Sequence, residues 1–238
     1  MDRFGLIGHP VDHSRSPELF REVYGHRWEY DLIDEPSFDR AWDRFISGPY
    51  RGVNVTAPFK EAAFKHADHR SPDALASGAA NILVKTERGI EAHNSDYLGI
   101  RRFIREEGIT GKALVVGYGG AGKAAAAAAL DSGLDVTICN RDITKAPGIR
   151  PPGELKTLAM DADIIFHCIP CKIPEAEGIR CACLFEANYR MPSMKDEPLI
   201  SRYIGGETWL RLQARTGFEI LTGMKAEFKG VKTKCVKC

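Results

Sequence analysis

Three glycines in the middle of the chain, Gly117, Gly119 and Gly122, have the spacing G-x-G-x-x-G. At this spacing the first glycine allows a tight turn, the second lets a pyrophosphate approach the backbone, and the third lets a helix pack close to a strand. The free N–H groups at the start of that helix then face the phosphates, where the helix dipole favours negative charge. The glycines predict a dinucleotide-binding turn; the alternative is a glycine-rich connection without a ligand.

The residues around these glycines have the pattern that such a turn requires. Residues 113–116 (ALVV) form an apolar run that suits a buried strand, and the alanine-rich run that ends at Leu130 favours a helix. A second strand pattern follows at 136–139, about 20 residues further on, where a residue that contacts the ribose is expected. The order strand, turn, helix and strand is the context in which this motif indicates a dinucleotide site.

Two serines near the N-terminus have hydroxyls beside the start of a predicted helix. Ser14 and Ser16 flank Arg15, and Pro17 suits the first helical position. Ser16 is then the expected N-cap. Considered alone, these serines fit helix capping better than ligand contact.

Lys60 and Asp96 are the candidate acid–base residues. Lys60 follows a predicted strand that Pro58 ends, and the ends of strands in an α/β sheet are a usual place for groups that bind a ligand. Asp96 lies in the first turn of a predicted helix, where a carboxylate suits the helix dipole. The alternatives are a solvated surface lysine and a helix-start charge.

The overall composition gives no reason to expect nucleic acid or a membrane as a partner. The chain has 238 residues and a formal net charge of +1. No apolar run approaches the roughly 18 residues that a membrane span needs. The N-terminus has no signal-peptide core, so the expected location is cytoplasmic.

The seven cysteines include two C-x-x-C pairs, Cys168 with Cys171 and Cys235 with Cys238. Paired motifs of this kind can hold zinc. Here the pairs are far apart in the sequence, so we expect reduced thiols and no metal site.

The order of elements predicts an α/β fold without internal repeats. An α/β unit precedes residue 100, alternating strands and helices from about 110 to 200 indicate a parallel sheet, and a C-terminal segment follows. Strands are expected over 4–8, 28–33, 51–56, 79–85, 89–94, 113–116, 135–139, 163–168 and 184–189. Helices are expected from 17, 59 and 95, after the glycine turn, and over 37–46, 154–160 and 205–216.

Taken together, these segments resemble the shikimate dehydrogenase family. The matching segments, in family order, are GHPVDHSRSPELF, GVNVTAPFK, AANIL, HNSDYLG, GYGGAG, NRD with Lys145, and WLRLQA. They cover most of the chain. The resemblance implies an N-terminal α/β substrate-binding catalytic domain (1–100, with a C-terminal return over 205–238). It also implies a Rossmann-type nucleotide domain with a doubly wound parallel sheet over 101–204.

The resemblance also implies a role for individual residues. Lys60 and Asp96 would form the catalytic pair. The residues implied to bind the substrate are Ser14, Ser16, Thr56, Asn81, Tyr189 and Gln213. Those implied to bind the cofactor are Gly117, Gly119, Gly120, Gly122, Asn140, Arg141 and Lys145.

These residue types suit the reduction of a ring ketone. The cofactor carries the hydride, and the protein supplies orientation and electrostatics. A lysine ammonium can donate a proton to the developing alkoxide, and a carboxylate beside it can hold the lysine and orient a ring hydroxyl. Arginine can stack on adenine and form paired hydrogen bonds with a 2′-phosphate.

The sequence departs from the family pattern at three places, and the chain is shorter than is usual. Asp142 replaces the family's threonine after Asn-Arg, and its carboxylate would repel a 2′-phosphate or accept from a free 2′-OH, while Arg141 and Lys145 favour NADP. Residues 167–169 (His-Cys-Ile) replace Asn-x-Thr and would alter the wall near the nicotinamide. Glu186 replaces an aspartate before Tyr189.

The leading prediction is an NADP-dependent oxidoreductase that interconverts 3-dehydroshikimate and shikimate, a step toward chorismate and the aromatic amino acids. One alternative is a quinate/shikimate dehydrogenase that uses NAD. A second is a non-catalytic sensor of a nucleotide or ring acid on the same scaffold. A folate-linked dehydrogenase fits the paired serines less well. A monomer or a homodimer is expected.

Overall fold

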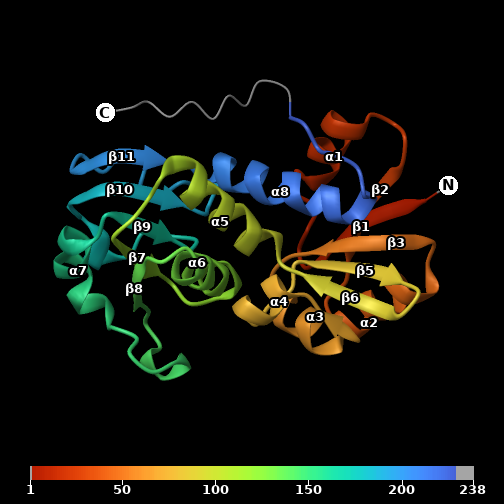
Figure 1. Ribbon diagram of the computed structural model, residues 1–238, viewed down its shortest axis with the longest axis horizontal. Coiled ribbons are helices and arrows are strands. Elements are labelled where there is room, and N and C mark those ends of the chain that lie inside the picture. Colours follow the sequence, from red (N-terminus) through yellow and green to blue (C-terminus); the bar gives the residue numbers. More distant parts are fainter. Residues whose placement is uncertain (1, 229–238) are drawn as a thin grey trace. The chain divides into compact units, whose positions relative to one another are not determined.

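The computed structural model describes residues 2–228 (Figure 1). The chain forms two compact units, which are described separately below. Unit 1 comprises Met1–Leu98 and Gln213–Cys238, and unit 2 comprises Gly99–Leu212. The boundaries lie within two helices, α5 (Ser95–Glu107) and α8 (Gly206–Thr222), so that each unit contains part of both.

Unit 1 is built on a six-stranded mixed sheet with the order β2-β1-β3-β5-β6-β4. Its strands are β1 (Arg3–Gly8), β2 (Glu29–Asp34), β3 (Tyr50–Val55), β4 (His69–Arg70), β5 (Ile82–Thr86) and β6 (Gly89–His93). Its helices are α1 (Ser16–Tyr24), α2 (Phe38–Ser47), α3 (Lys60–His66) and α4 (Pro72–Ser77). Strands β2, β1 and β3 are parallel, whereas β3, β5 and β6 pair antiparallel.

Two apolar layers enclose this sheet. On one side, Phe38 and Phe45 of α2 pack with Phe59 and with the strand residues Ile33 and Val53. On the other side lies an aromatic cluster from β1, α1, β2 and α8, with Phe20 at its centre. Its members are Phe4, Phe20, Tyr24, Trp28, Tyr30 and Phe218. Figure 1 shows α2 and α3 on one side of the sheet and α1 on the other.

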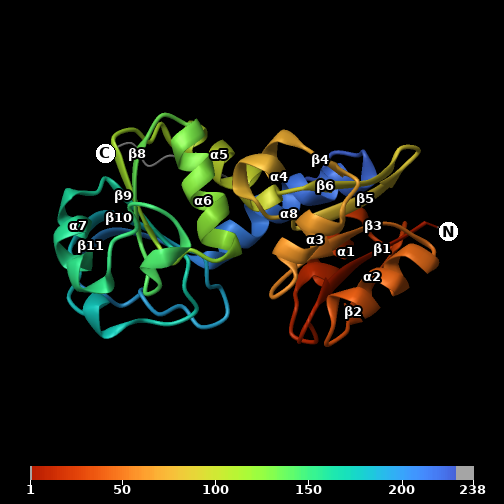
Figure 2. The same ribbon diagram turned by 90° about the horizontal axis from the view of Figure 1, so that it is seen from below.

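Unit 2 contains a five-stranded parallel sheet with the order β11-β10-β9-β7-β8. The strands are β7 (Lys112–Val116), β8 (Asp135–Cys139), β9 (Ile164–His167), β10 (Cys181–Glu186) and β11 (Ile200–Ile204). The helices that lie wholly within it are α6 (Gly120–Asp131) and α7 (Leu155–Asp161). Short 3₁₀ turns occupy Ile143–Lys145, Pro152–Glu154 and Pro174–Ala176. Figure 2 shows α6 alongside this sheet.

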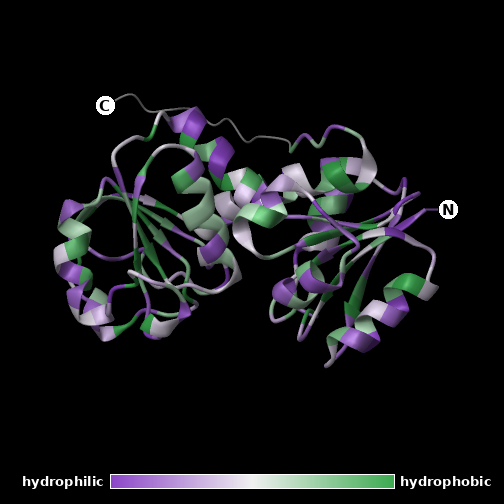
Figure 3. Ribbon diagram, turned by 60° about the horizontal axis from the view of Figure 1, so that its bottom comes forward, coloured by the Kyte–Doolittle hydropathy of each residue, from purple (hydrophilic) through white to green (hydrophobic). Residues whose placement is uncertain are grey.

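Alternating side chains of these strands face two helical layers. Leu114, Ile165 and Leu184 pack in one buried cluster with Leu155 and Ala159 of α7. On the other face, the rings of Phe166 and Phe185 stack with Phe103 of α5 and Trp209 of α8. The hydrophobic strands stand out in both sheets of Figure 3. The predicted two-domain α/β fold class is confirmed.

Several elements differ from the prediction in detail. The two-residue strand β4, the six-residue helix α4 and the edge strand β11 were not expected. Helix α1 begins at Ser16 itself, its N-cap is Arg15, and no side chain caps it. The expectation that Ser16 is the N-cap is therefore wrong, which leaves the hydroxyl available for other partners.

Two expectations concern metals and membranes. Within residues 2–228, no cluster of three or more His, Cys, Asp or Glu side chains is arranged to hold a metal ion. Cys235 and Cys238 lie outside the described residues. No helix of the described part is long and apolar enough to span a bilayer.

Candidate functional site

Lys60 and Asp96 form a largely buried ion pair in unit 1. Lys60 is the first residue of α3, directly after the turn that follows β3, and Asp96 lies in the first turn of α5. The Lys60 Nζ donates to Asp96 Oδ2 at 2.6 Å, and the side chains are 18% and 6% exposed. Such an ion pair needs further hydrogen bonds to offset desolvation, because removing two charges from water is costly.

Asn81 supplies one of these hydrogen bonds. Its Nδ2 donates to Asp96 Oδ2 and to Ser95 Oγ, both at 3.0 Å, and its Oδ1 accepts from the Ser95 backbone N–H at 2.7 Å. Ser95 in turn donates to Gln213 Oε1 at 3.3 Å. Asn81 therefore fixes the carboxylate that holds the lysine, and Gln213 of α8 joins the same network.

Asn94 holds the start of the helix that carries Asp96. It is fully buried, and its Oδ1 accepts from the Tyr97 backbone N–H at 3.1 Å. Its Nδ2 donates to Ser77 Oγ and to the Ala79 carbonyl. Sequence reasoning singled out neither Asn94 nor Ser95 as site residues, although both belong to the segment HNSDYLG.

Ser14 and Ser16 lie together in the loop between β1 and α1. The Ser14 Oγ donates to Ser16 Oγ at 3.2 Å and accepts from the Ser16 backbone N–H at the same distance. Thr56, also predicted to bind substrate, lies just beyond β3, and its backbone N–H donates to the Ile7 carbonyl of β1. The ends of β1 and β3 thus bring Thr56 and the start of the serine loop to one edge of the sheet.

Two further residues connect the serines with β3, and sequence reasoning missed both. The Tyr30 hydroxyl hydrogen-bonds to Ser16 and donates to Asn54 Oδ1 at 2.7 Å. Asn54 is buried, at 6% exposure. A Cβ on Gly217 of α8 would lie 3.1 Å from Ser95 Oγ and 3.4 Å from Asn54 Nδ2, so the lysine network and the serine network approach each other there.

The glycine turn of unit 2 joins β7 to α6. Gly117 has a φ of +94°, and a Cβ on Gly122 would lie 2.0 Å from the Gly117 carbonyl oxygen. A Cβ on Gly119 would meet nothing within 4 Å, and Gly120 begins α6. The space beside Gly119 fits a pyrophosphate at the helix N-terminus.

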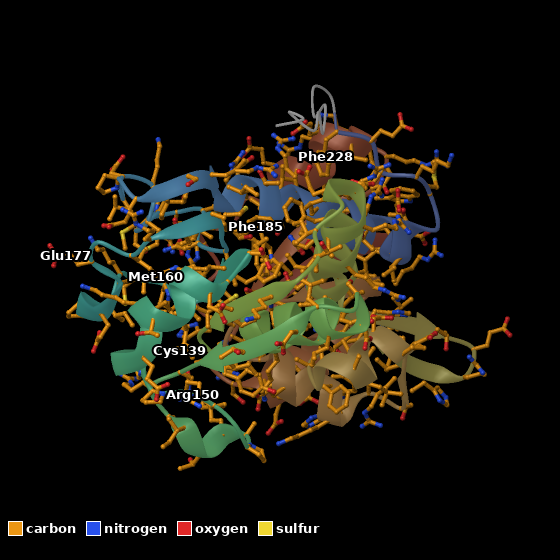
Figure 4. All side chains as sticks on the ribbon, turned by 60° about the vertical axis from the view of Figure 1, so that its left-hand side comes forward. Cys139, Arg150, Met160, Glu177, Phe185 and Phe228 are labelled. Atoms are coloured by element: carbon orange, nitrogen blue, oxygen red, sulfur yellow. The ribbon has the colours of Figure 1, made fainter. Side chains whose placement is uncertain are left out.

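A pocket of about 500 Å³ lies beside this turn. Its walls include Gly117, Asn140, Arg141, Asp142 and Lys145, three of them predicted to face the adenosine part of a cofactor. Part of the wall belongs to the loop between Cys139 and Arg150, both labelled in Figure 4. Asn140 Oδ1 accepts from the Tyr118 backbone N–H at 3.2 Å, which links this loop to the glycine turn.

Asp142 is the departure from the family pattern at this pocket. Its carboxylate accepts from the Thr144 hydroxyl at 2.6 Å and from the Thr144 backbone N–H at 3.0 Å. These hydrogen bonds hold the pKa of Asp142 below its ordinary value. The side chain is therefore an anion that caps the short turn 143–145, with much of its hydrogen-bonding capacity used locally.

The other departures lie at the ends of β9 and β10. Ile169 lines the pocket, whereas His167 is buried, at 1% exposure, and is absent from its walls. Burial lowers the pKa of His167 to about 4, although the carboxylate of Glu186, 3.8 Å away, opposes this. Glu186 accepts from Ser193 and from the Tyr203 hydroxyl.

Tyr189 belongs to unit 2, unlike the other predicted substrate-binding residues. It follows β10, and its backbone packs against α8, since a Cβ on Gly206 would lie 2.5 Å from the Tyr189 nitrogen. Its predicted role in binding stays a prediction.

These two units define a class of protein. A parallel sheet with a glycine turn and a nucleotide-sized pocket is typical of dinucleotide-dependent oxidoreductases, and the buried lysine–carboxylate pair in the other unit suits proton transfer to a carbonyl oxygen.

Comparison with known proteins identifies the family. Residues 6–83 match the model of the shikimate dehydrogenase substrate binding domain. A shikimate dehydrogenase (NADP(+)) of Thermus thermophilus is 34% identical over 234 residues, covering 93% of this chain and 88% of that protein. The chain belongs to the shikimate dehydrogenase family.

Solved structures agree with this assignment. The shikimate dehydrogenase of Mycobacterium tuberculosis matches with a TM-score of 0.79 at 29% identity, covering 95% of both chains. Shikimate 5-dehydrogenase of Thermus thermophilus, in complex with NADP(H) and shikimate, matches with a TM-score of 0.78 at 27% identity and the same coverage.

Proposed function

We propose that this chain catalyses the reversible, NADP-dependent reduction of 3-dehydroshikimate to shikimate. The observation that carries the proposal is the buried Lys60–Asp96 pair, held by Asn81 and connected to Gln213 through Ser95. The family and its NADP- and shikimate-bound relative support it. Unit 1 is proposed to bind the ring acid and unit 2 the dinucleotide.

In the proposed mechanism, Lys60 and Asp96 manage the proton. NADPH, when bound, supplies a hydride to the ring carbon that carries the ketone. The Lys60 ammonium donates a proton to the oxygen of that carbon, so the ketone becomes a hydroxyl, and in the reverse direction the neutral amine takes the proton back. Asp96 keeps the amine oriented and accepts a hydrogen bond from a ring hydroxyl. Acid–base help of this kind contributes about 10²–10⁴-fold to the rate.

The remaining site residues are proposed to bind. Ser14 and Ser16 donate to the ring carboxylate, and their position in a paired loop suits an anion. Ring hydroxyls and the carboxylate are contacted by Thr56, Asn81, Gln213 and Tyr189.

NADP is proposed over NAD because of the charges at the adenosine pocket. Arg141 and Lys145 line it and suit a 2′-phosphate. The Asp142 carboxylate, which would oppose that phosphate, is engaged by Thr144. The dinucleotide fits the turn because the space beside Gly119 would be filled by any side chain there.

The test is oxidation of shikimate by the purified protein with NADP⁺, followed at the NADPH absorbance band. We expect Lys60→Ala to lower kcat by about 10²–10⁴-fold while shikimate binding, measured by calorimetry, survives in part. Lys65→Ala, an exposed lysine on the same helix, is the matched control and should keep the wild-type rate. Wild-type turnover in Lys60→Ala would remove the mechanism.

The same assay separates the alternatives. Faster turnover with NAD⁺ and quinate than with NADP⁺ and shikimate would indicate a quinate/shikimate dehydrogenase. Binding of shikimate and NADPH without any turnover would indicate a sensor.

A further inference from the structure

Tyr30 occupies an unusual position among the polar residues of unit 1. Its ring belongs to the aromatic cluster, with centroids 4.8 Å from Phe20 and 6.1 Å from Phe218, but its hydroxyl leaves that cluster to join Ser16 and Asn54. Burial raises the pKa of Tyr30, so the phenol keeps its proton at neutral pH. The hydroxyl is therefore a permanent donor with one proton.

Counting protons fixes the direction of every hydrogen bond in this chain. The Asn54 Oδ1 can only accept, so Tyr30 donates to it. The Tyr30 proton is then used, and Ser16 must donate to the Tyr30 oxygen. The Ser16 proton is used in turn, and Ser14 donates to Ser16. Without a ligand, all three hydroxyl protons are directed along the chain toward Asn54.

A carboxylate ligand reverses this demand. Its oxygens can only accept, so they attract the protons of both serines. When Ser16 turns its proton to the anion, its oxygen becomes an acceptor, and the Tyr30 hydroxyl can rotate from Asn54 to Ser16. The resulting chain, from Tyr30 through Ser16 to the carboxylate, ends on a charge, and such hydrogen bonds are about twice as strong as neutral ones.

We propose that Tyr30 is a positioning residue for recognition of the substrate carboxylate, because its hydroxyl exchanges Asn54 for Ser16 and so frees both serine protons for the anion. The inference rests on the proposed function, in which Ser14 and Ser16 bind the ring carboxylate. It assigns to Tyr30 an effect on substrate affinity and none on the proton transfer at Lys60.

The test compares Tyr30→Phe with Tyr24→Phe, which is a matched control from the same aromatic cluster. The Tyr24 hydroxyl donates to the Met224 carbonyl and accepts from Thr222, so that variant also loses a phenol but leaves the serines untouched. We expect Tyr30→Phe to raise KM for shikimate about tenfold, the effect of losing one hydrogen bond in a chain that ends on a charge. The kcat should stay within about twofold of wild type, and Tyr24→Phe should leave both constants unchanged.

A second readout separates carboxylate recognition from a general structural effect. Shikimate methyl ester keeps the ring hydroxyls and lacks the charge, so the ratio of kcat/KM for shikimate to kcat/KM for the ester measures the contribution of the anion. We expect Tyr30→Phe to reduce this ratio about tenfold, and Tyr24→Phe to leave it unchanged.

Three results would overturn the inference. In the first, KM for shikimate in Tyr30→Phe stays within twofold of wild type. In the second, kcat and KM change together with a lowered Tm while the acid-to-ester ratio is unaffected, which indicates a packing role. In the third, the wild-type protein and both variants all fail to oxidise shikimate, and this removes the proposed function as well.

Discussion

At the scale of single residues, the site depends on side chains that hold other side chains. Asp96 contacts Lys60, but Asn81 fixes Asp96, and Asn94 fixes the helix that carries it. A buried charge pair is stable only when its remaining hydrogen-bonding capacity is used. Polar residues that touch no ligand are therefore as necessary to the geometry as those that do.

His167 gives a pH-dependent prediction. Burial, with Glu186 opposing, lowers the pKa of His167 to about 4 from an ordinary 6.5, so between these values the unfolded chain binds a proton that the folded protein does not. Folding stability therefore falls as pH drops from about 6.5 to about 4 and does not fall further through this residue below that. The contribution is of the order of 3 kcal/mol.

The measurement is urea unfolding of wild type and His167→Asn at several pH values. We expect the acidic loss of the free energy of unfolding to be smaller in the variant, by about one proton's contribution. Equal pH dependence in the two proteins would contradict the pKa shift.

The sequence predicted some of these residues and not others. Lys60 and Asp96 stand out because each has a chemistry-bearing group beside the end or start of an element. Tyr30 and Asn54 do not, because their hydrogen bond joins strands that are 24 residues apart in the chain. The direction of the Tyr30 hydroxyl depends on how β2 and β3 lie beside β1, which no local pattern reveals.

At the scale of elements, the turn between β7 and α6 has two glycines with different constraints. At Gly122 a side chain would collide with the Gly117 carbonyl, so this glycine is needed for the fold. At Gly119 the φ is −91° and the surrounding space is open, so the fold itself would accept alanine there. The proposed pyrophosphate is the only partner that a methyl group at Gly119 would obstruct within 4 Å.

We therefore expect Gly119→Ala and Gly122→Ala to differ in stability but not in cofactor binding. Both should weaken NADPH binding at least tenfold by fluorescence titration. Only Gly122→Ala should lower Tm, because backbone must move to accept its methyl group. An unchanged NADPH affinity in Gly119→Ala would place the pyrophosphate elsewhere.

Elements with strong patterns were predicted well, and short ones were not. The strand at 135–139 agrees residue for residue with β8, since it is apolar and bounded by polar residues. The strand β4 has two residues and α4 has six, too few to produce a periodic pattern. Helix α8 extends to Thr222, beyond the predicted end at 216, because Phe218 and Leu221 are buried in unit 1.

At the scale of the whole molecule, each unit contains its own proposed ligand-binding groups. Ligands that bind only the folded state raise its stability, by about 2.7 kcal/mol at a hundredfold excess over Kd. We expect shikimate alone and NADP⁺ alone each to raise Tm of the wild-type protein.

Gly119→Ala should lose the shift caused by NADP⁺ and keep the shift caused by shikimate. Differential scanning fluorimetry measures both. Loss of the shikimate shift in this variant would mean that the two binding events depend on a common structure.

The return of α8 to unit 1 has a consequence for how the protein is made. Gln213, Gly217 and Phe218 complete a unit whose other residues belong to the first 98 of the chain. A ribosome therefore releases every residue of the nucleotide unit before it has translated the helix that finishes the substrate unit. The nascent N-terminal sheet must wait with the Phe20 face uncovered, and the dinucleotide unit is the first that can fold to completion.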